Sequence, residues 1–135
     1  MATHFGELLG IEHLPAPDGV ALLELPVQAQ LCNRLGTVHG GVLMSLLDTA
    51  GLWACAAPGT TPNATTVSLT CSFLAPATLE GTPHLTARAD VVKRGRSMIF
   101  CSIVVTAAGG RPIAMAQGTF LQLGERRAAE AELRS

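Results

Sequence analysis

The residues best suited to chemistry lie between positions 33 and 48, in the stretch NRLGTVHGGVLMSLLD. Asn33, His39 and a Gly-Gly pair are followed by an apolar run that ends at Asp48, the only acidic residue between positions 25 and 79. A carboxylate in so apolar a setting is costly unless it is exposed, paired or used in a reaction. We therefore interpret Asp48 as a reactive group and expect the rest of the chain to position the helix that carries it.

Gly40 is expected at the N-terminus of this helix, where backbone N–H groups lack acceptors and the helix dipole favours negative charge. We expect its N–H to bind the oxyanion that forms when a carbonyl is attacked, while Asn33 and His39 polarise the carbonyl or hold the loop. Asp48 would drive the attack, either as a general base on water or as a nucleophile, and the sequence does not choose between them. The hydroxyl of Thr66, on the following strand, is suited to orient the water or the carboxylate.

One geometric constraint follows from the spacing of these groups. Gly40 and Asp48 are eight residues apart, which is about 12 Å along a helix at a rise of about 1.5 Å per residue. Both cannot reach one carbon atom from the same straight helix. We therefore expect a site shared by two protomers, with Asp48 and Thr66 from one and Asn33, His39 and Gly40 from its partner.

Periodicity predicts the elements that must hold these residues. A short amphipathic helix is expected within residues 1–10, and a strand over 20–27. The apolar helix over 40–57 is expected to end near Pro58 and Gly59. Strands are then expected over 66–73, 84–93, 97–107 and 111–123, with turns at 94–95 and 109–110.

Two of these strands carry informative faces. From Thr66 to Ser72 the even positions are hydroxyl residues and the odd ones apolar, which predicts one dry face. Ala114, Ala116 and Gly118 form a small-residue face, against which a helix can lie closely. Because an apolar helix needs cover on most sides, we expect an α+β architecture, in which a curved antiparallel sheet wraps around the long central helix.

The motif and this element order together resemble the hotdog-fold acyl-CoA thioesterases. The motif reads Asn33-x-x-Gly36-x-x-His39-Gly40-Gly41, with Asp48 nine residues after the histidine. Thr66 and the Ala75-Pro76-Ala77 step also match, and the similarity extends from about Leu23 to Leu123. The most similar branch includes PaaI of phenylacetate degradation and the mammalian THEM2-like enzymes.

The resemblance implies a cofactor-independent enzyme that hydrolyses an aromatic (phenylacetyl- or hydroxybenzoyl-like) or medium-chain acyl-CoA to the free acid and CoA. It implies the same roles for the residues above, with Gly41 also contacting substrate, and shared active sites at a dimer interface, usually within a tetramer. Helix residues that could line an acyl pocket are Leu46, Leu47, Leu52 and Trp53.

A basic turn is the candidate contact for the phosphates of CoA. Lys93, Arg94, Gly95 and Arg96 lie together in the sequence, with Arg88 on the preceding strand. Gly95 permits a tight turn, and three cations can meet a phosphate-rich group. The position resembles the nucleotide-contacting turn of the family, and an ordinary solvated hairpin tip is the alternative.

Two other functions stay open at this point. One is a hotdog hydratase or dehydratase that acts on acyl thioesters, and the other is a non-catalytic acyl-CoA-binding module. The sequence contains no G-x-S-x-G elbow, P-loop or dinucleotide fingerprint, so an α/β-hydrolase thioesterase or a nucleotide-dependent enzyme is not expected.

Composition sets the remaining expectations. The 135 residues fit one domain, residues 1–135, in which residues 125–135 form a charged tail that carries six of the nineteen charges. So few charges elsewhere predict a homo-oligomer, a dimer or dimer of dimers (homotetramer), that hides apolar surface. A net charge of −1 argues against nucleic-acid binding. The four cysteines lack metal-ligand spacing, so we expect reduced thiols and no bound metal. The N-terminus lacks a basic signal region, which favours a cytoplasmic protein. Because Asp48 would interrupt a membrane span, we expect no membrane contact.

Overall fold

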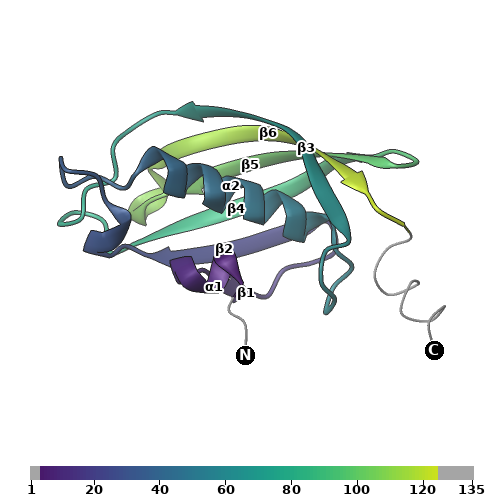
Figure 1. The fold of residues 1–135 in the computed structure, drawn as a ribbon, viewed down its shortest axis with the longest axis horizontal. Coiled ribbons are helices and arrows are strands. Elements are labelled where there is room, and N and C mark those ends of the chain that lie inside the picture. The colour runs from purple at the N-terminus through teal and green to yellow at the C-terminus, as the bar shows by residue number, and fades with distance from the viewer. Residues whose placement is uncertain (1–3, 125–135) are drawn as a thin grey trace.

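The computed structural model describes residues 4–124, in which one long helix lies on a curved antiparallel sheet (Figure 1). In chain order the elements are α1 (Phe5–Leu9), β1 (Glu12–Leu14), β2 (Val20–Pro26), η1 (Ala29–Leu31), α2 (Gly40–Cys55), β3 (Ala64–Phe73), β4 (His84–Arg94), β5 (Met98–Thr106), η2 (Ala108–Gly110) and β6 (Pro112–Gln122). The six strands pair antiparallel in the order β1-β2-β4-β5-β6-β3. The expected α+β architecture is confirmed.

The predicted helices and strands are present, with small differences at their ends. Helix α2 ends at Cys55, before Pro58 and Gly59, because its C-cap Ala56 already has extended backbone. The short strand β1 was not expected, since its sequence, Glu12–Leu14, shows no alternation. The predicted tail, residues 125–135, lies outside the described residues.

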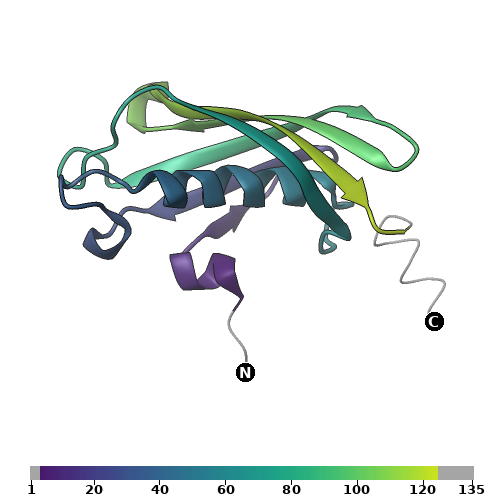
Figure 2. The same cartoon turned by 45° about the horizontal axis from the view of Figure 1, so that its top comes forward.

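The core lies between α2 and the concave face of the sheet (Figure 2). Leu46, Leu47 and Ala50 of α2 are fully buried, and so are Leu85 and Ala87 of β4, as the alternation along that strand predicts. The sheet covers one face of the helix. The opposite face is only partly buried; it carries Val42, Ser45, Thr49 and Leu52.

The predicted small-residue face on β6 is confirmed, and it meets α2 closely. Ala114, Ala116 and Gly118 are all buried. A Cβ added to Gly118 would lie 2.6 Å from Cε2 of Phe120, and one added to Gly51 of α2 would overlap Cζ of the same ring. The helix can therefore approach β6 only because both positions lack a side chain.

Two further expectations, on the cysteines and on spanning helices, can be compared with residues 4–124. All four cysteines are free thiols, as expected. No helix among residues 4–124 is both long enough and apolar enough to span a bilayer.

Candidate active site

The loop before α2 is held by the side chain of Asn33. Its Oδ1 accepts hydrogen bonds from the N–H of Leu35 (2.9 Å), the N–H of Thr37 (3.2 Å) and the hydroxyl of Thr37 (3.1 Å). Gly36 takes a positive φ of 80°, which closes the turn at little steric cost. The amide oxygen of Asn33 thus holds the loop, and its Nδ2 group remains available as a donor.

His39 caps the N-terminus of α2 with its ring. Nδ1 accepts a hydrogen bond from the Gly41 N–H at 2.8 Å, while the His39 carbonyl accepts from the N–H groups of Val42 and Leu43. A Cβ on Gly41 would lie only 3.0 Å from Nδ1, so glycine at this position lets the ring reach the backbone. Because Nδ1 is the acceptor, the proton of the neutral ring is on Nε2.

Three donors therefore project from the tip of α2: the Gly40 N–H, His39 Nε2–H and Asn33 Nδ2. Among the described residues none of the three has an acceptor. All three residues are exposed, and the space next to the Gly40 Cα is open for at least 4 Å. Such a tip can bind an oxygen that carries negative charge.

Asp48 and Thr66 form the second half of the candidate site. The hydroxyl of Thr66 donates to Oδ1 of Asp48 at 2.6 Å, and both residues are partly buried. This short distance is typical of a hydrogen bond to an ionised carboxylate. Among residues 4–124 no hydrogen-bond donor contacts Oδ2, which is therefore available to a water molecule or a substrate.

The expected alternation along β3 holds from Ser68 to Ser72 but fails at Thr66 and Val67, and this failure explains how Thr66 reaches Asp48. Thr66 pairs with Phe120 and Ser68 pairs with Thr119, so Val67 forms a β-bulge. One extra residue reverses the facing of the side chains beyond it. Thr66 therefore shares the helix-facing side with Leu69, whereas Val67 is 51% exposed.

Cys71 is a neighbour of this pair that sequence reasoning missed. It lies beyond the bulge on the helix-facing side of β3, and it is half-buried. Burial raises the pKa of the Cys71 thiol, and the charge of Asp48 raises it further. The Cys71 side chain is therefore a protonated thiol, and it lies within electrostatic reach of the Asp48 carboxylate. Only the register of β3 reveals this position, because a lone cysteine has no sequence signal of its own.

The single chain does not bring the two halves of the site together. The donors are at the first turn of α2, and Asp48 lies eight residues along the same helix, about 12 Å away at about 1.5 Å per residue. No bend interrupts the helix between them, since its residues form one continuous α-helix from Gly40 to Cys55.

The predicted basic residues lie on different sides of the hairpin between β4 and β5. A bulge at Val92 turns Arg94 toward the helix, where its Nη1 donates to the Cys55 carbonyl at 3.4 Å. Arg88 is exposed and donates two hydrogen bonds of 2.9 Å to Asp90. Lys93 and Arg96 have no charged or hydrogen-bonding partner among the described residues.

Gly95 forms the tight turn that was predicted between β4 and β5. Its N–H donates to the Met98 carbonyl at 2.7 Å, and a Cβ at this position would lie 3.0 Å from that oxygen. The turn thus brings Lys93 and Arg96 to the end of an exposed hairpin. Their contact with the substrate stays a prediction.

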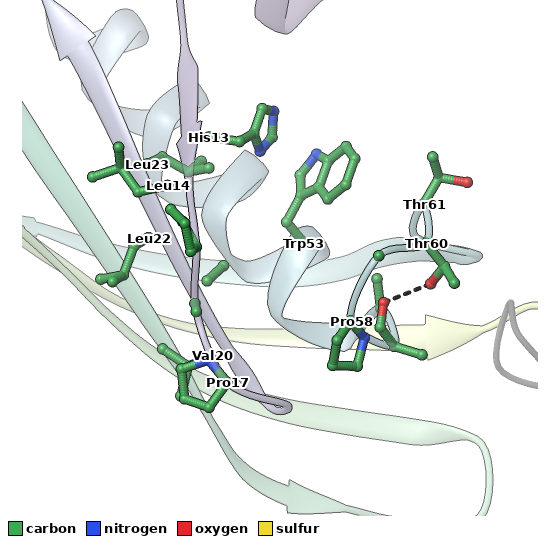
Figure 3. A pocket seen from close by; sticks show the side chains of 16 residues that line it. His13, Leu14, Pro17, Val20, Leu22, Leu23, Trp53, Pro58, Thr60 and Thr61 are labelled. Atoms are coloured by element: carbon green, nitrogen blue, oxygen red, sulfur yellow. Dashed lines mark hydrogen bonds between the residues drawn. The ribbon is translucent and has the colours of Figure 1, made fainter.

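A groove of about 510 Å³ opens at the other end of α2 (Figure 3). It lies between the turn joining β1 to β2 and the loop after α2. The rings of His13 and Trp53 meet at its rim with centroids 4.4 Å apart, and partial burial lowers the pKa of His13. Trp53 is rotated about 140° around the helix from Asp48, so this groove is separate from the Asp48 pair. Leu46 and Leu47 belong to the core and do not line it.

Comparison with known proteins decides the family. The sequence profile of the thioesterase superfamily matches residues 35–114, more than half of the chain. The chain belongs to the thioesterase superfamily. This thioesterase is therefore a thioester hydrolase, as its motif predicts, and its helix-on-sheet architecture is the hotdog fold of that family.

Two relatives and one solved structure show how close the likeness is. The thioesterase is 32% identical to the acyl-coenzyme A thioesterase PaaI of Escherichia coli over 116 residues, which are 86% of this chain and 80% of PaaI. It is 29% identical to human acyl-coenzyme A thioesterase 13 over 120 residues, which are 87% and 84% of the two chains. The structure of E. coli PaaI superposes with a TM-score of 0.80 at 30% identity, covering 90% of this chain and 85% of PaaI.

Proposed function

We propose that this thioesterase hydrolyses an acyl-CoA to the free acid and CoA, with either an aromatic acyl group of the phenylacetyl or hydroxybenzoyl kind or a medium-chain aliphatic one. The hydrogen bond of 2.6 Å from Thr66 to Asp48 carries the proposal, because it fixes a carboxylate with one free oxygen on the partly exposed side of α2. The names of the PaaI and acyl-coenzyme A thioesterase 13 relatives support the substrate class.

The reaction uses the two halves of the site in turn. In one route Asp48 takes a proton from a water molecule, whose oxygen attacks the thioester carbon. The carbonyl oxygen becomes an oxyanion that the Gly40 N–H binds, with Asn33 and His39 as further donors. Collapse breaks the C–S bond, and the proton passes from Asp48 to the leaving thiolate. In the other route Asp48 attacks the carbon directly, and water then hydrolyses the mixed anhydride.

A homo-oligomer completes this site, as a dimer or a dimer of dimers. The distance along α2 keeps Gly40 away from Asp48 in one chain, so each reaction site takes its donors from the partner protomer. The half-buried face of α2 and the outer edge of β3 are apolar enough to be covered in such a dimer: Val67 and Phe73 of β3 are each about half exposed. An active monomer would contradict this arrangement.

In this proposal the CoA moiety binds at the basic hairpin. Lys93 and Arg96 are free to bind phosphate, whereas Arg94 already contacts the end of α2. Gly41 contacts the substrate beside Gly40 at the helix tip. The protein acts in the cytoplasm and uses no cofactor.

The experiment that tests this function is a thiol-release screen over aromatic and aliphatic acyl-CoAs with the wild type and Asp48→Asn. We expect the variant to fold and to lose turnover by about 10²–10⁴-fold, the usual contribution of a positioned base. Asp90→Asn is the matched control, because Asp90 pairs with Arg88 on the exposed side of the sheet. Equal turnover by Asp48→Asn and the wild type would remove the mechanism.

The same screen separates the rival functions. An enzyme that adds or removes water at an enoyl thioester changes enoyl absorbance without releasing thiol. A binding module retains acyl-CoA and releases no thiol from any substrate in the panel. Either result would replace the proposed hydrolysis.

A further inference from the structure

Phe120 connects the two elements that carry Asp48 and Thr66. It is a fully buried residue of β6, and it pairs with Thr66 of β3 on one side and Ile99 of β5 on the other. Its ring also contacts the position of Gly51, which lies three residues after Asp48 on α2. One side chain thus lies directly beside the strand position of the hydroxyl and against the helix turn that follows the carboxylate.

The fit of the Phe120 ring is tight on both sides. On the helix side, a Cβ at Gly51 would overlap Cζ and lie 2.8 Å from Cε2. On the sheet side, a Cβ at Gly118 would lie 2.6 Å from Cε2 and 2.7 Å from Cζ. The ring edge therefore fills the gap between two residues that lack side chains, and its thickness sets how closely α2 approaches β6.

We propose that Phe120 is a positioning residue of the thioesterase reaction, which holds Asp48 at hydrogen-bonding distance from Thr66 by setting the spacing between α2 and the β3–β6 pair. This inference rests on the proposed role of Asp48 and Thr66 in hydrolysis. Phe120 itself is buried beneath the helix and acts through the other two residues.

The sensitivity of the Thr66–Asp48 contact makes this spacing matter. The contact is 2.6 Å long, within the narrow range of about 2.5–2.7 Å that is usual for a hydroxyl on a carboxylate, and such bonds also weaken steeply when their angle is bent. Close-packed interiors transmit a displacement instead of absorbing it. A methyl group added at Gly51 must therefore move either the ring or the helix, and a movement of the helix carries Asp48 with it.

The test is a double-mutant comparison of kcat and KM. Gly51→Ala and Phe120→Leu are made in the wild type and in Thr66→Val. In the wild type each is expected to lower kcat by about tenfold, with KM nearly unchanged, since a misplacement of about 1 Å can cost up to about 10²-fold. In Thr66→Val the same changes are expected to have little further effect on kcat, because the contact through which they act is already gone.

The two changes also offer a rescue. In Gly51→Ala/Phe120→Leu the added methyl group takes space that the ring edge has vacated, so kcat is expected to exceed that of Gly51→Ala alone. Gly6→Ala is the matched control, because a Cβ there meets only Ile11 Cδ1, at 4.0 Å. A thermal melt of each variant separates lost folding from lost turnover. Should Gly51→Ala fail to fold, Phe120→Leu alone decides, since a smaller apolar side chain is tolerated in such a core.

The outcomes distinguish this inference from the proposed function. If Asp48→Asn is inactive but Gly51→Ala and Phe120→Leu lower kcat equally with and without the Thr66 hydroxyl, Phe120 is only a core residue and the inference is overturned. Unchanged kcat in both folded variants overturns it too. If Asp48→Asn keeps full turnover, the proposed role of Asp48 in hydrolysis fails, and the inference about Phe120, which rests on that role, fails with it.

Discussion

The helix tip and the Asp48–Thr66 pair are built in opposite ways. At the tip, the side-chain hydrogen bonds of Asn33 and His39 join residues no more than four positions apart, although backbone hydrogen bonds also tie the loop to Leu31, Ala77 and Leu79. The pair joins residues 18 positions apart, and it depends on the register of β3 against β6. Among the described residues, the donor side chains of the tip are thus held by local contacts and face no acceptor, whereas the pair is a long-range contact that holds a carboxylate and has no oxyanion donors.

This contrast explains why neither half is sufficient on its own. The donors need a developing negative charge, and the carboxylate needs an electrophile whose oxygen is already held. Two chains that exchange these halves would complete both sites at once.

After Asp48→Asn, the largest effect is expected from removing the Gly40 N–H, the backbone donor at the tip that has no acceptor among the described residues. Gly40 is the first residue of α2, the position where proline is tolerated in a helix, and His39 before it already has the extended backbone that proline requires (φ −60°, ψ 137°). Gly40→Pro therefore deletes an N–H with little change to the helix. We expect turnover to fall by about 10²–10³-fold in the thiol-release assay, as for the loss of an oxyanion donor.

Gly40→Ala is the matched control for this change. It keeps the N–H and adds a Cβ where no other atom lies within 4 Å, so a smaller loss is expected. If alanine and proline reduce turnover equally, the N–H is not the oxyanion donor and the tip acts by shape alone.

A mixture of two inactive variants tests whether the halves come from different chains. Co-expressed Gly40→Pro and Asp48→Asn chains form hybrid dimers in which one of the two sites has both its donors and its carboxylate. Random pairing makes half of the dimers hybrid, so about a quarter of wild-type activity should return. Hybrids purified through two different tags should show about half of wild-type activity, because one of their two sites is complete. A hybrid no more active than its parents would place both halves of each site in one chain.

The next effect concerns the pair. Thr66→Val removes the hydroxyl but keeps the β-branched shape, so we expect turnover to fall by about tenfold with the loss of one hydrogen bond to a charged group. Ser68→Ala is the control. A strand without a bulge would put both hydroxyls on one face, whereas the observed bulge turns Ser68 away from the helix. Equal losses in the two variants would contradict the observed register.

These two halves also mark what the sequence could predict. The motif from Asn33 to Asp48 lies on one loop and one helix, so its spacing alone locates the tip and the carboxylate. The order of the helix and strands along the chain and the small-residue face at Gly118 follow from periodicity, whereas the order of the strands within the sheet does not. The bulge at Val67 does not, because hydroxyl and apolar residues alternate through it without interruption and only pairing with β6 reveals the extra residue. Cys71, which lies within electrostatic reach of the carboxylate on the helix-facing side of β3, was missed for the same reason.

The smallest effect is expected at the far end of α2. There Arg94 satisfies the Cys55 carbonyl within the chain, so this end of the helix is closed where the tip is open. A cation near a helix C-terminus stabilises it by about 0.3–1 kcal/mol, and Arg94→Gln should lower the free energy of unfolding by that amount in urea titrations.

Lys93→Gln, which breaks no contact among the described residues, should leave stability unchanged and raise KM for acyl-CoA if the hairpin binds phosphate. Equal stability in both variants would mean that the end of the helix needs no partner. The contrast between a closed end and an open tip would then rest on the tip alone.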